Sequence, residues 1–126
     1  RPRIMASILR VNTLTDASSN NSVPMATVAE GSAKAWIRYV TTTSTAINDS
    51  FNISSVSDGG TGITTISFSN NMGNSNFSVS AVAGQDEAFI KFRSPATSSW
   101  LISTANPSSS GTDFERIGNS VHGDLA

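Results

Sequence analysis

Short segments in which apolar and polar side chains alternate recur along the chain, separated by clusters of Gly, Asn, Asp and Ser. A period of two is typical of β-strands that present two different faces. In the clearest case, residues 33–40, one face carries Ala33, Ala35, Ile37 and Tyr39, and the other carries Lys34, Trp36, Arg38 and Val40. A sheet with one face in water would not need large side chains on both faces, so this pattern predicts a strand with a second partner surface.

The same pattern predicts strands at 6–14, 33–40, 51–57, 62–69, 77–83, 88–93, 98–104 and 114–122. Residues 23–28 contain Pro24 and are expected to form an edge strand or an extended connector. Asp58, Gly59, Gly60 and Thr61 predict the tight turn of a hairpin, because glycine adopts positive φ values readily. Phe51 and Ile53 are expected to share one strand face.

No segment shows a helical period, and the turn clusters recur at close to the roughly 8–12-residue spacing of β-sandwiches and barrels. The predicted fold is therefore all-β: an antiparallel sandwich or barrel-like domain over residues 33–126. Residues 1–32 lack aromatic side chains and are expected to form an extended N-terminal arm for docking or assembly.

Composition limits the core that one chain can build. Of the 126 residues, 23 are Ser, 13 are Thr and 11 are Asn, whereas apolar residues make up only 37%. Ile and Val together number 18 against 4 Leu, a bias that favours strands. We therefore expect an intertwined homotrimer that supplements a thin core. Six aromatic residues are expected in a core within or between chains: Trp36, Phe51, Phe68, Phe77, Phe89 and Trp100.

The charge pattern bears on partners. The net charge is −1, and the eight Lys and Arg residues are scattered, so no basic stripe suited to nucleic acid is expected. No apolar stretch reaches the length of a membrane span, so no membrane insertion is expected. The chain contains no cysteine, which excludes disulfides and thiolate metal sites.

Residues capable of catalysis occur without a convincing arrangement. Ser120, His122 and Asp124 would share a strand face, but residues two apart on a strand lie roughly 7 Å apart, too far for a hydrogen-bonded triad. Asp113 and Glu115 would also share a strand face, at a separation that suits a glycosidase pair. Asp86 and Glu87 adjoin in a predicted turn. We expect no catalytic, metal or cofactor site, and a non-enzymatic protein.

Several motifs resemble small structural proteins of marine tailed bacteriophages, the tail-fibre or fibre-like proteins. The motifs are SILRVNTL (7–14), DAS (16–18), GSAKAWI (31–37), DSFNISSVSDGGTG (49–62), ISF (66–68), MGNSNF (72–77) and VHGD (121–124). The match is strongest over residues 31–77. Little of it falls within residues 85–118.

The resemblance implies a virion component on the surface of the phage particle. It implies a homotrimeric fibre or knob whose N-terminal arm docks onto other virion proteins, with a host-surface glycan or protein as a further partner. Tail fibre and capsid-attached fibre or decoration protein remain alternatives. Receptor contact would fall on loop tips at 58–62, 70–76 or 106–112.

Two hypotheses of another class remain beside the virion component. A carbohydrate-binding module would use Trp36, Tyr39 or Trp100 for stacking on sugars. An enzyme would use the carboxylates of Asp113 and Glu115.

Overall fold

The computed structural model describes residues 7–84 and 87–126. The chain divides into two compact units, Arg1–Ser32 and Ala33–Ala126. Each unit is described by itself below.

The N-terminal unit contains a small hairpin and one helix. Strands β1 (Thr13–Thr15) and β2 (Ser22–Pro24) pair antiparallel, and helix α1 (Met25–Gly31) follows at once. The carboxylate of Asp16 organises the turn between the strands, accepting hydrogen bonds from the Asn20 amide at 3.0 Å and from Asn21 Nδ2 at 2.6 Å. These bonds, the Asn21 side chain first, lower the pKa of Asp16.

Two predictions for this unit are wrong. Of the predicted edge strand or connector 23–28, residues 23–24 lie in strand β2, but residues 25–28 belong to the helix. Of the predicted strand 6–14, only residues 13–14 are in a strand, and residue 6 lies outside the described residues. Pro24, at φ −60°, suits the start of a helix. An amide N–H at this position would have no partner within the helix, and proline has no amide N–H. The helix showed no apolar period because none of its residues is buried.

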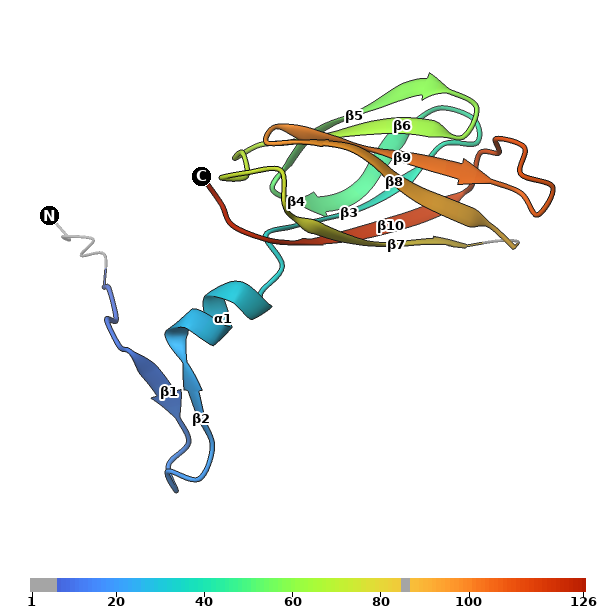
Figure 1. The fold of residues 1–126 in the computed structure, drawn as a ribbon. Helices are drawn as coiled ribbons and strands as arrows, with labels where there is room; N and C mark the ends of the chain where they lie inside the picture. The colour runs from blue at the N-terminus through green and yellow to red at the C-terminus, as the bar shows by residue number, and fades with distance from the viewer. Residues whose placement is uncertain (1–6, 85–86) are drawn as a thin grey trace, which may run out of the picture. The chain divides into compact units, whose positions relative to one another are not determined.

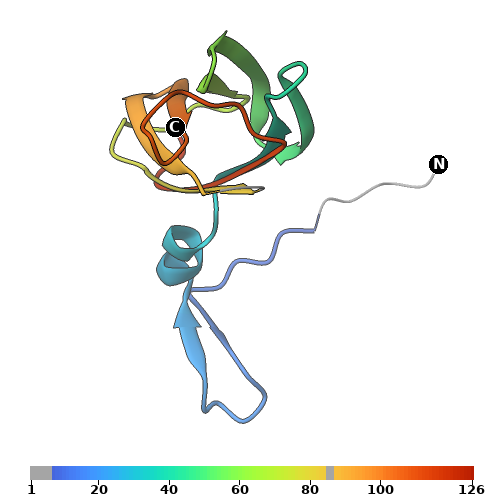
Figure 2. The same ribbon diagram turned by 90° about the vertical axis from the view of Figure 1, so that its right-hand side faces the viewer.

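The C-terminal unit consists of eight antiparallel strands in two four-stranded sheets (Figure 1). They are β3 (Ala35–Val40), β4 (Ala46–Phe51), β5 (Ile53–Gly60), β6 (Ile63–Phe68), β7 (Ser78–Gly84), β8 (Phe89–Ala96), β9 (Ser99–Ala105) and β10 (Arg116–His122). One sheet has the order β4-β3-β10-β7 and the other β5-β6-β9-β8. Seen along the strands, the sheets curve around a shared interior (Figure 2). The prediction of an all-β sandwich is thereby confirmed.

The core lies between the two sheets and follows the alternation of the sequence. Strand β3 buries every second residue, as do β6, β9 and β10. The buried apolar residues are Ala35, Ile37, Tyr39, Ile66, Phe68, Met72, Phe77, Trp100, Ile102, Phe114, Ile117 and Val121. All of them belong to the C-terminal unit, so each sheet contributes one apolar face to one interior.

The predicted hairpin exists, but its details differ. Strand β5 continues through Asp58–Gly60, and the turn falls at Thr61 and Gly62. Strand β4 was not predicted, because most of its residues are exposed and its sequence does not alternate.

Phe51 and Ile53 do not share a face, because Asn52, at φ 57°, turns the chain from one sheet into the other. Its side chain fixes this corner: Nδ2 donates to the carbonyls of Lys34 and Asn70, and Oδ1 accepts the Asn70 amide at 2.7 Å.

The interior contains a small polar cluster beside its aromatic rings. Trp100 packs with its ring centroid 4.8 Å from that of Phe68, and its Nε1 donates to Asn119 Oδ1 at 3.3 Å. The Tyr39 hydroxyl is buried, and no described group lies in hydrogen-bond geometry with it. Burial raises the pKa of Tyr39 well above its usual value, although Thr64 and Asn119 lie near enough to offset part of that rise.

We therefore predict that Tyr39→Phe alters the dependence of stability on pH. The folded state holds the phenolic proton of Tyr39 more tightly than the unfolded state does. The free energy of unfolding is therefore unaffected by this group below the unfolded pKa, and it falls as the pH rises above that value. Above about pH 10 the wild type should lose about 1.4 kcal/mol per pH unit relative to the variant. Below that pH the variant should be as stable or about 1 kcal/mol more stable, since it removes an unpaired buried hydroxyl.

Urea unfolding of both proteins on either side of about pH 10 would measure this difference. Tyr39 is the single tyrosine of the chain, so tyrosinate absorbance reports its ionisation alone. A wild-type tyrosine that ionises at its ordinary pKa while the protein stays folded would contradict the buried position.

Candidate functional site

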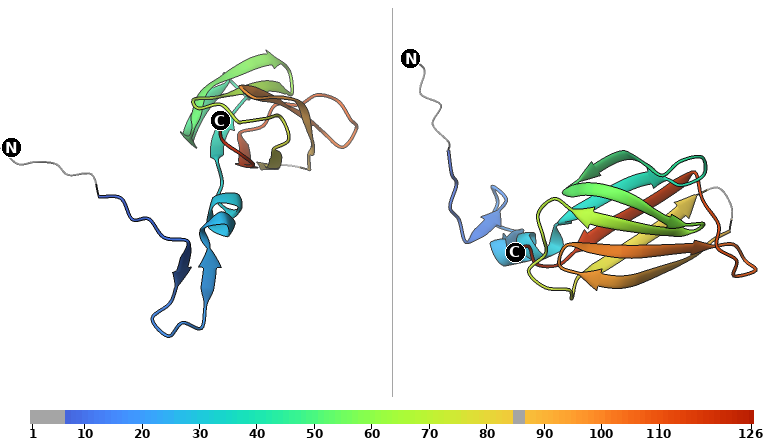
Figure 3. Two further views of the ribbon diagram at one scale, coloured as in Figure 1. Left: turned by 60° about the vertical axis from the view of Figure 1, so that its left-hand side comes forward. Right: turned by 90° about the horizontal axis from the view of Figure 1, so that it is seen from above.

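The two ends of the C-terminal unit differ in which connections and chain ends lie there. At one end, called here the loop end, lie the β3–β4 connection (41–45), the β5–β6 turn (61–62), residues 87–88 before β8, and the β9–β10 connection (106–115). The other end, called here the junction end, holds Ala33, where the chain enters from the N-terminal unit, and the C-terminus (Figures 1 and 3). The β6–β7 and β8–β9 connections also lie at the junction end, where the Met72 amide donates to the Thr97 carbonyl at 2.8 Å. The connections of the loop end therefore lie at the end of this unit opposite Ala33.

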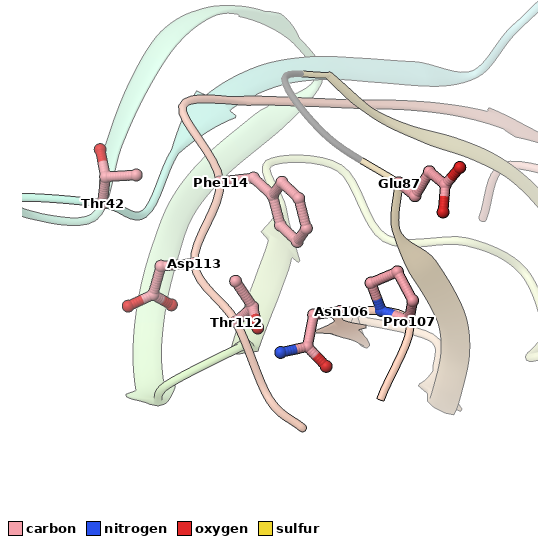
Figure 4. A pocket seen from close by; sticks show the side chains of 7 residues that line it. All are labelled: Thr42, Glu87, Asn106, Pro107, Thr112, Asp113 and Phe114. Carbon is pink, nitrogen blue, oxygen red and sulfur yellow. The ribbon is translucent and has the colours of Figure 1, made fainter. Parts of the chain in front are cut away.

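A cavity of about 490 Å³ opens at the loop end (Figure 4). It is called here the loop-end cavity, and its lining residues are Thr42, Glu87, Asn106, Pro107, Thr112, Asp113 and Phe114. Its size falls in the range of roughly 300–1,000 Å³ that is usual for small-molecule sites. Its lining combines carboxylate, amide and hydroxyl groups with the ring of Pro107 and the largely buried ring of Phe114. No Lys or Arg is among these residues.

The carboxylate of Asp113 is held in place by the backbone of a neighbouring loop. Its Oδ1 accepts the Gly62 amide at 2.8 Å, and the Gly62 carbonyl accepts the Thr104 amide at 2.7 Å. Thr104 in turn bonds Thr112, its Oγ1 donating to the Thr112 carbonyl at 2.7 Å. The β5–β6 turn, the end of β9 and the segment before β10 thus form one hydrogen-bonded unit, which leaves Asp113 Oδ2 as an acceptor of fixed position.

The amide of Asn106 is oriented in the same way. Its Oδ1 accepts the backbone amides of Ser108 at 3.0 Å and Ser110 at 3.1 Å. Because the oxygen is engaged by the loop, Nδ2 is the group left to donate toward the cavity, on the side of the amide that faces Asp113 in Figure 4. On the wall behind, Phe114 donates its amide to Thr41 Oγ1 at 3.0 Å. The cavity therefore contains a fixed acceptor and a fixed donor on one frame.

The carboxylate pair predicted from the sequence is not brought together. Asp113 and Glu115 lie before β10 rather than on a strand, and Glu115 is exposed and does not line the loop-end cavity. Glu87 lines it instead, so the two acidic residues of the cavity come from segments far apart in the sequence. Asp86, its predicted neighbour in the turn, lies outside the described residues. Sequence spacing alone offered no signal that Glu87 and Asp113 would line the same cavity.

The remaining predicted site residues divide clearly. Tyr39 and Trp100 are fully buried, so the hypothesis that they stack on sugars is wrong. Ser120 and His122 lie on β10, and within residues 7–84 and 87–126 no hydrogen bond joins either side chain to Asp124.

Of the three candidate receptor loops, residues 58–62 and 106–112 reach the loop end. Residues 70–76 lie at the junction end, where the Gly73 amide donates to the Asp124 carbonyl at 2.7 Å.

The outer face of the β4-β3-β10-β7 sheet is the second notable surface. Trp36 and its cross-strand partner Phe51 are 39% and 54% exposed, and Val82 is 65% exposed. Gly118, opposite Val82 in the ladder, has no side chain, and shallow depressions of about 370 and 220 Å³ lie on either side of it. Exposed apolar side chains around a hollow are typical of a surface that binds another protein surface.

Comparisons with protein-family models, with curated proteins and with solved structures found no match. Among the described residues, no group of three or more His, Cys, Asp or Glu side chains could hold a metal ion. No helix in the same part of the chain has the length and apolar character needed to cross a bilayer.

We predict that Gly62→Ala strongly destabilises the loop end. Gly62 has φ +71°, and an added Cβ would collide with the Thr104 carbonyl oxygen and lie 2.7 Å from the Thr112 amide nitrogen. The free energy of unfolding should fall by at least about 2 kcal/mol, measured by urea denaturation.

Gly60→Ala is the matched control. Gly60 also has positive φ, at +117°, but nothing lies within 4 Å of its added Cβ. It therefore isolates the conformational cost, and Gly62→Ala should exceed it. Equal losses would show that the turn is not packed against Thr104 and Thr112.

Proposed function

We propose that this protein is a non-enzymatic structural component of a bacteriophage virion, a trimeric fibre protein of the tail. The observation that carries the proposal is the difference in burial between the two units. One unit contains the whole buried core, and the described part of the other unit, residues 7–32, buries no residue at all. The fibre-protein motifs described above span both units.

The N-terminal unit supports a docking role because it cannot be stable through its own packing. A hairpin of two three-residue strands is at best marginal in water, and so is a seven-residue helix. Ile8 and Leu9 are 73% and 79% exposed, and Leu14 is 42% exposed. Ordering on other virion proteins would bury these side chains, as expected of a segment that docks the fibre onto the particle.

The outer face of the β4-β3-β10-β7 sheet supports self-association. Trp36, Phe51 and Val82 are large apolar side chains on the solvent side of a sheet whose other side is already buried. Ser80, Gly118 and Ser120 between them are small, so a second copy can approach closely. We assign this face to contact between copies of the chain, which gives the second partner surface that the alternation of β3 predicts.

A capsid-attached fibre or decoration protein shares all these features and differs only in location. Labelled density in electron micrographs of the particle separates the two: density on the tail supports the tail fibre, and density on the capsid supports the alternative.

We predict that the full chain is a trimer and that Val82→Lys dissociates it. A lysine at a 65% exposed position should cost a single chain less than about 0.5 kcal/mol, but it would place three charges in the interface. Light scattering should give three times 13.1 kDa for the wild type and a mass near 13.1 kDa for the variant.

Phe89→Lys is the matched control, because Phe89 is 54% exposed on the other sheet and should leave the trimer intact. A monomeric wild type would refute the trimer. Dissociation by Phe89→Lys but not by Val82→Lys would place the interface on the other sheet.

We also predict that Ile8→Ser combined with Leu9→Ser removes the protein from assembled particles. Both side chains are exposed, so the free energy of unfolding of the C-terminal unit should change by less than about 0.5 kcal/mol. Immunoblotting of purified particles measures incorporation, and Ser18→Ala in the same unit serves as a control. Normal incorporation of the double variant would exclude these side chains from docking.

A further inference from the structure

We infer that the loop-end cavity binds a neutral sugar residue of a cell-surface glycan. The inference rests on the proposed function for its biological role, because it names the class of receptor that such a fibre would contact. Its chemistry depends only on the residues that line the cavity.

The first step is the pairing of a fixed acceptor with a fixed donor. Asp113 Oδ1 is engaged by the Gly62 amide and Asn106 Oδ1 by two backbone amides, so neither side chain needs to be ordered when a ligand arrives. Each hydroxyl of a sugar both donates and accepts a hydrogen bond. A carboxylate oxygen and an amide N–H on one rigid frame therefore suit two adjacent sugar hydroxyls, and the rigidity reduces the entropy lost on binding.

The second step concerns charge. Glu87 and Asp113 make the cavity acidic, and its lining contains no Lys or Arg. Burying a charge without a partner of opposite sign is costly, so this lining disfavours sulfated, phosphorylated and carboxylated sugars. A neutral sugar, whose hydroxyls can donate to the carboxylates, fits the lining best.

The third step concerns the apolar part of the lining. The Pro107 ring offers an exposed apolar surface, and the buried Phe114 also lines the cavity (Figure 4). Sugars present C–H groups on their ring faces as well as hydroxyls at their edges, so a site for them needs both kinds of surface. Small-molecule sites in general combine apolar walls with a few placed polar groups.

The location agrees with the chemistry. The cavity lies at the loop end, whereas Ala33, the first residue of the C-terminal unit, lies at the junction end. Thr112 and Asn106 belong to the longest connection between strands of the sandwich, where binding residues are commonly found.

Saturation-transfer NMR on the full-length protein tests the inference. The probes are the methyl glycosides of glucose, galactose, mannose, rhamnose and N-acetylglucosamine at millimolar concentration, with N-acetylneuraminic acid as the anionic probe. We expect transfer to at least one neutral glycoside and none to the anionic sugar. Absence of transfer to every neutral probe, or preference for the anionic one, would overturn the inference.

Two conservative variants locate the binding. Asn106→Asp keeps the oxygen that holds the Ser108 and Ser110 amides and replaces the Nδ2 donor, and Asp113→Asn keeps the oxygen that holds the Gly62 amide. Each should weaken binding by about ten- to hundredfold, the effect expected for a lost hydrogen bond to a charged or oriented group. Unchanged binding in both variants would overturn the assignment to this cavity.

Each variant has a matched control. Ser108→Asp adds the same charge to the same loop without removing the Asn106 donor, and Glu115→Gln neutralises a carboxylate outside the cavity; both should bind like the wild type. Release of sugar from an aryl glycoside would overturn a purely binding role. Resonance shifts of the cavity residues caused by calcium chloride, when the sugars cause none, would overturn the assignment of a sugar as the ligand. Light scattering of the same samples distinguishes failure of the sugar site from failure of the proposed function. A trimer that binds no sugar contradicts the sugar site and leaves the proposed fibre protein intact.

Discussion

The packing of Trp100 between the two sheets is the interaction on which the C-terminal unit most depends. Its side chain is fully buried, it lies against Phe68 within its own sheet, and its Nε1 bonds Asn119 on β10 of the opposite sheet. This bond across the interior specifies the pairing register of β10 within its own sheet, because a slip of one residue would turn Asn119 outward. The apolar residues around it then need only fill the space that this contact defines.

The strands that the sequence predicted well are those that pack against this interior. In β3, β6 and β9, buried residues such as Ile37, Ile66 and Ile102 alternate with more exposed neighbours because one face of each strand is buried. Strand β4 and helix α1 have no such face, so their sequences contain no period to detect. The reversal at Asn52 was missed for a different reason: positive φ is uncommon in residues other than glycine, and here only the surrounding hydrogen bonds stabilise it.

The loop-end cavity was predictable only in its parts. The loop 106–112 was expected from its Pro, Ser and Gly content, and Asp113 was singled out as a carboxylate of interest. Which carboxylate accompanies it depends on strand order, since β8 and β10 belong to different sheets and their loops converge only at the end of the sandwich. Local sequence carries information on turns, whereas a cavity formed by several connections requires the topology.

The small core and the exposed aromatic residues both follow from how this chain distributes its few apolar side chains. Apolar residues make up 37% of the chain, and in the part that the structure describes twelve of them are buried in one interior. Trp36, Phe51 and Phe89 nevertheless remain exposed. Folding covers part of each side chain and leaves Trp36 39% exposed and Phe51 and Phe89 54% exposed. Exposed apolar side chains of this kind are common on folded proteins. Burial against a second copy would gain roughly 1.5–3 kcal/mol for each such side chain. A sandwich that leaves Trp36, Phe51 and Phe89 exposed while it buries other aromatic rings would therefore gain further stability by covering these three side chains.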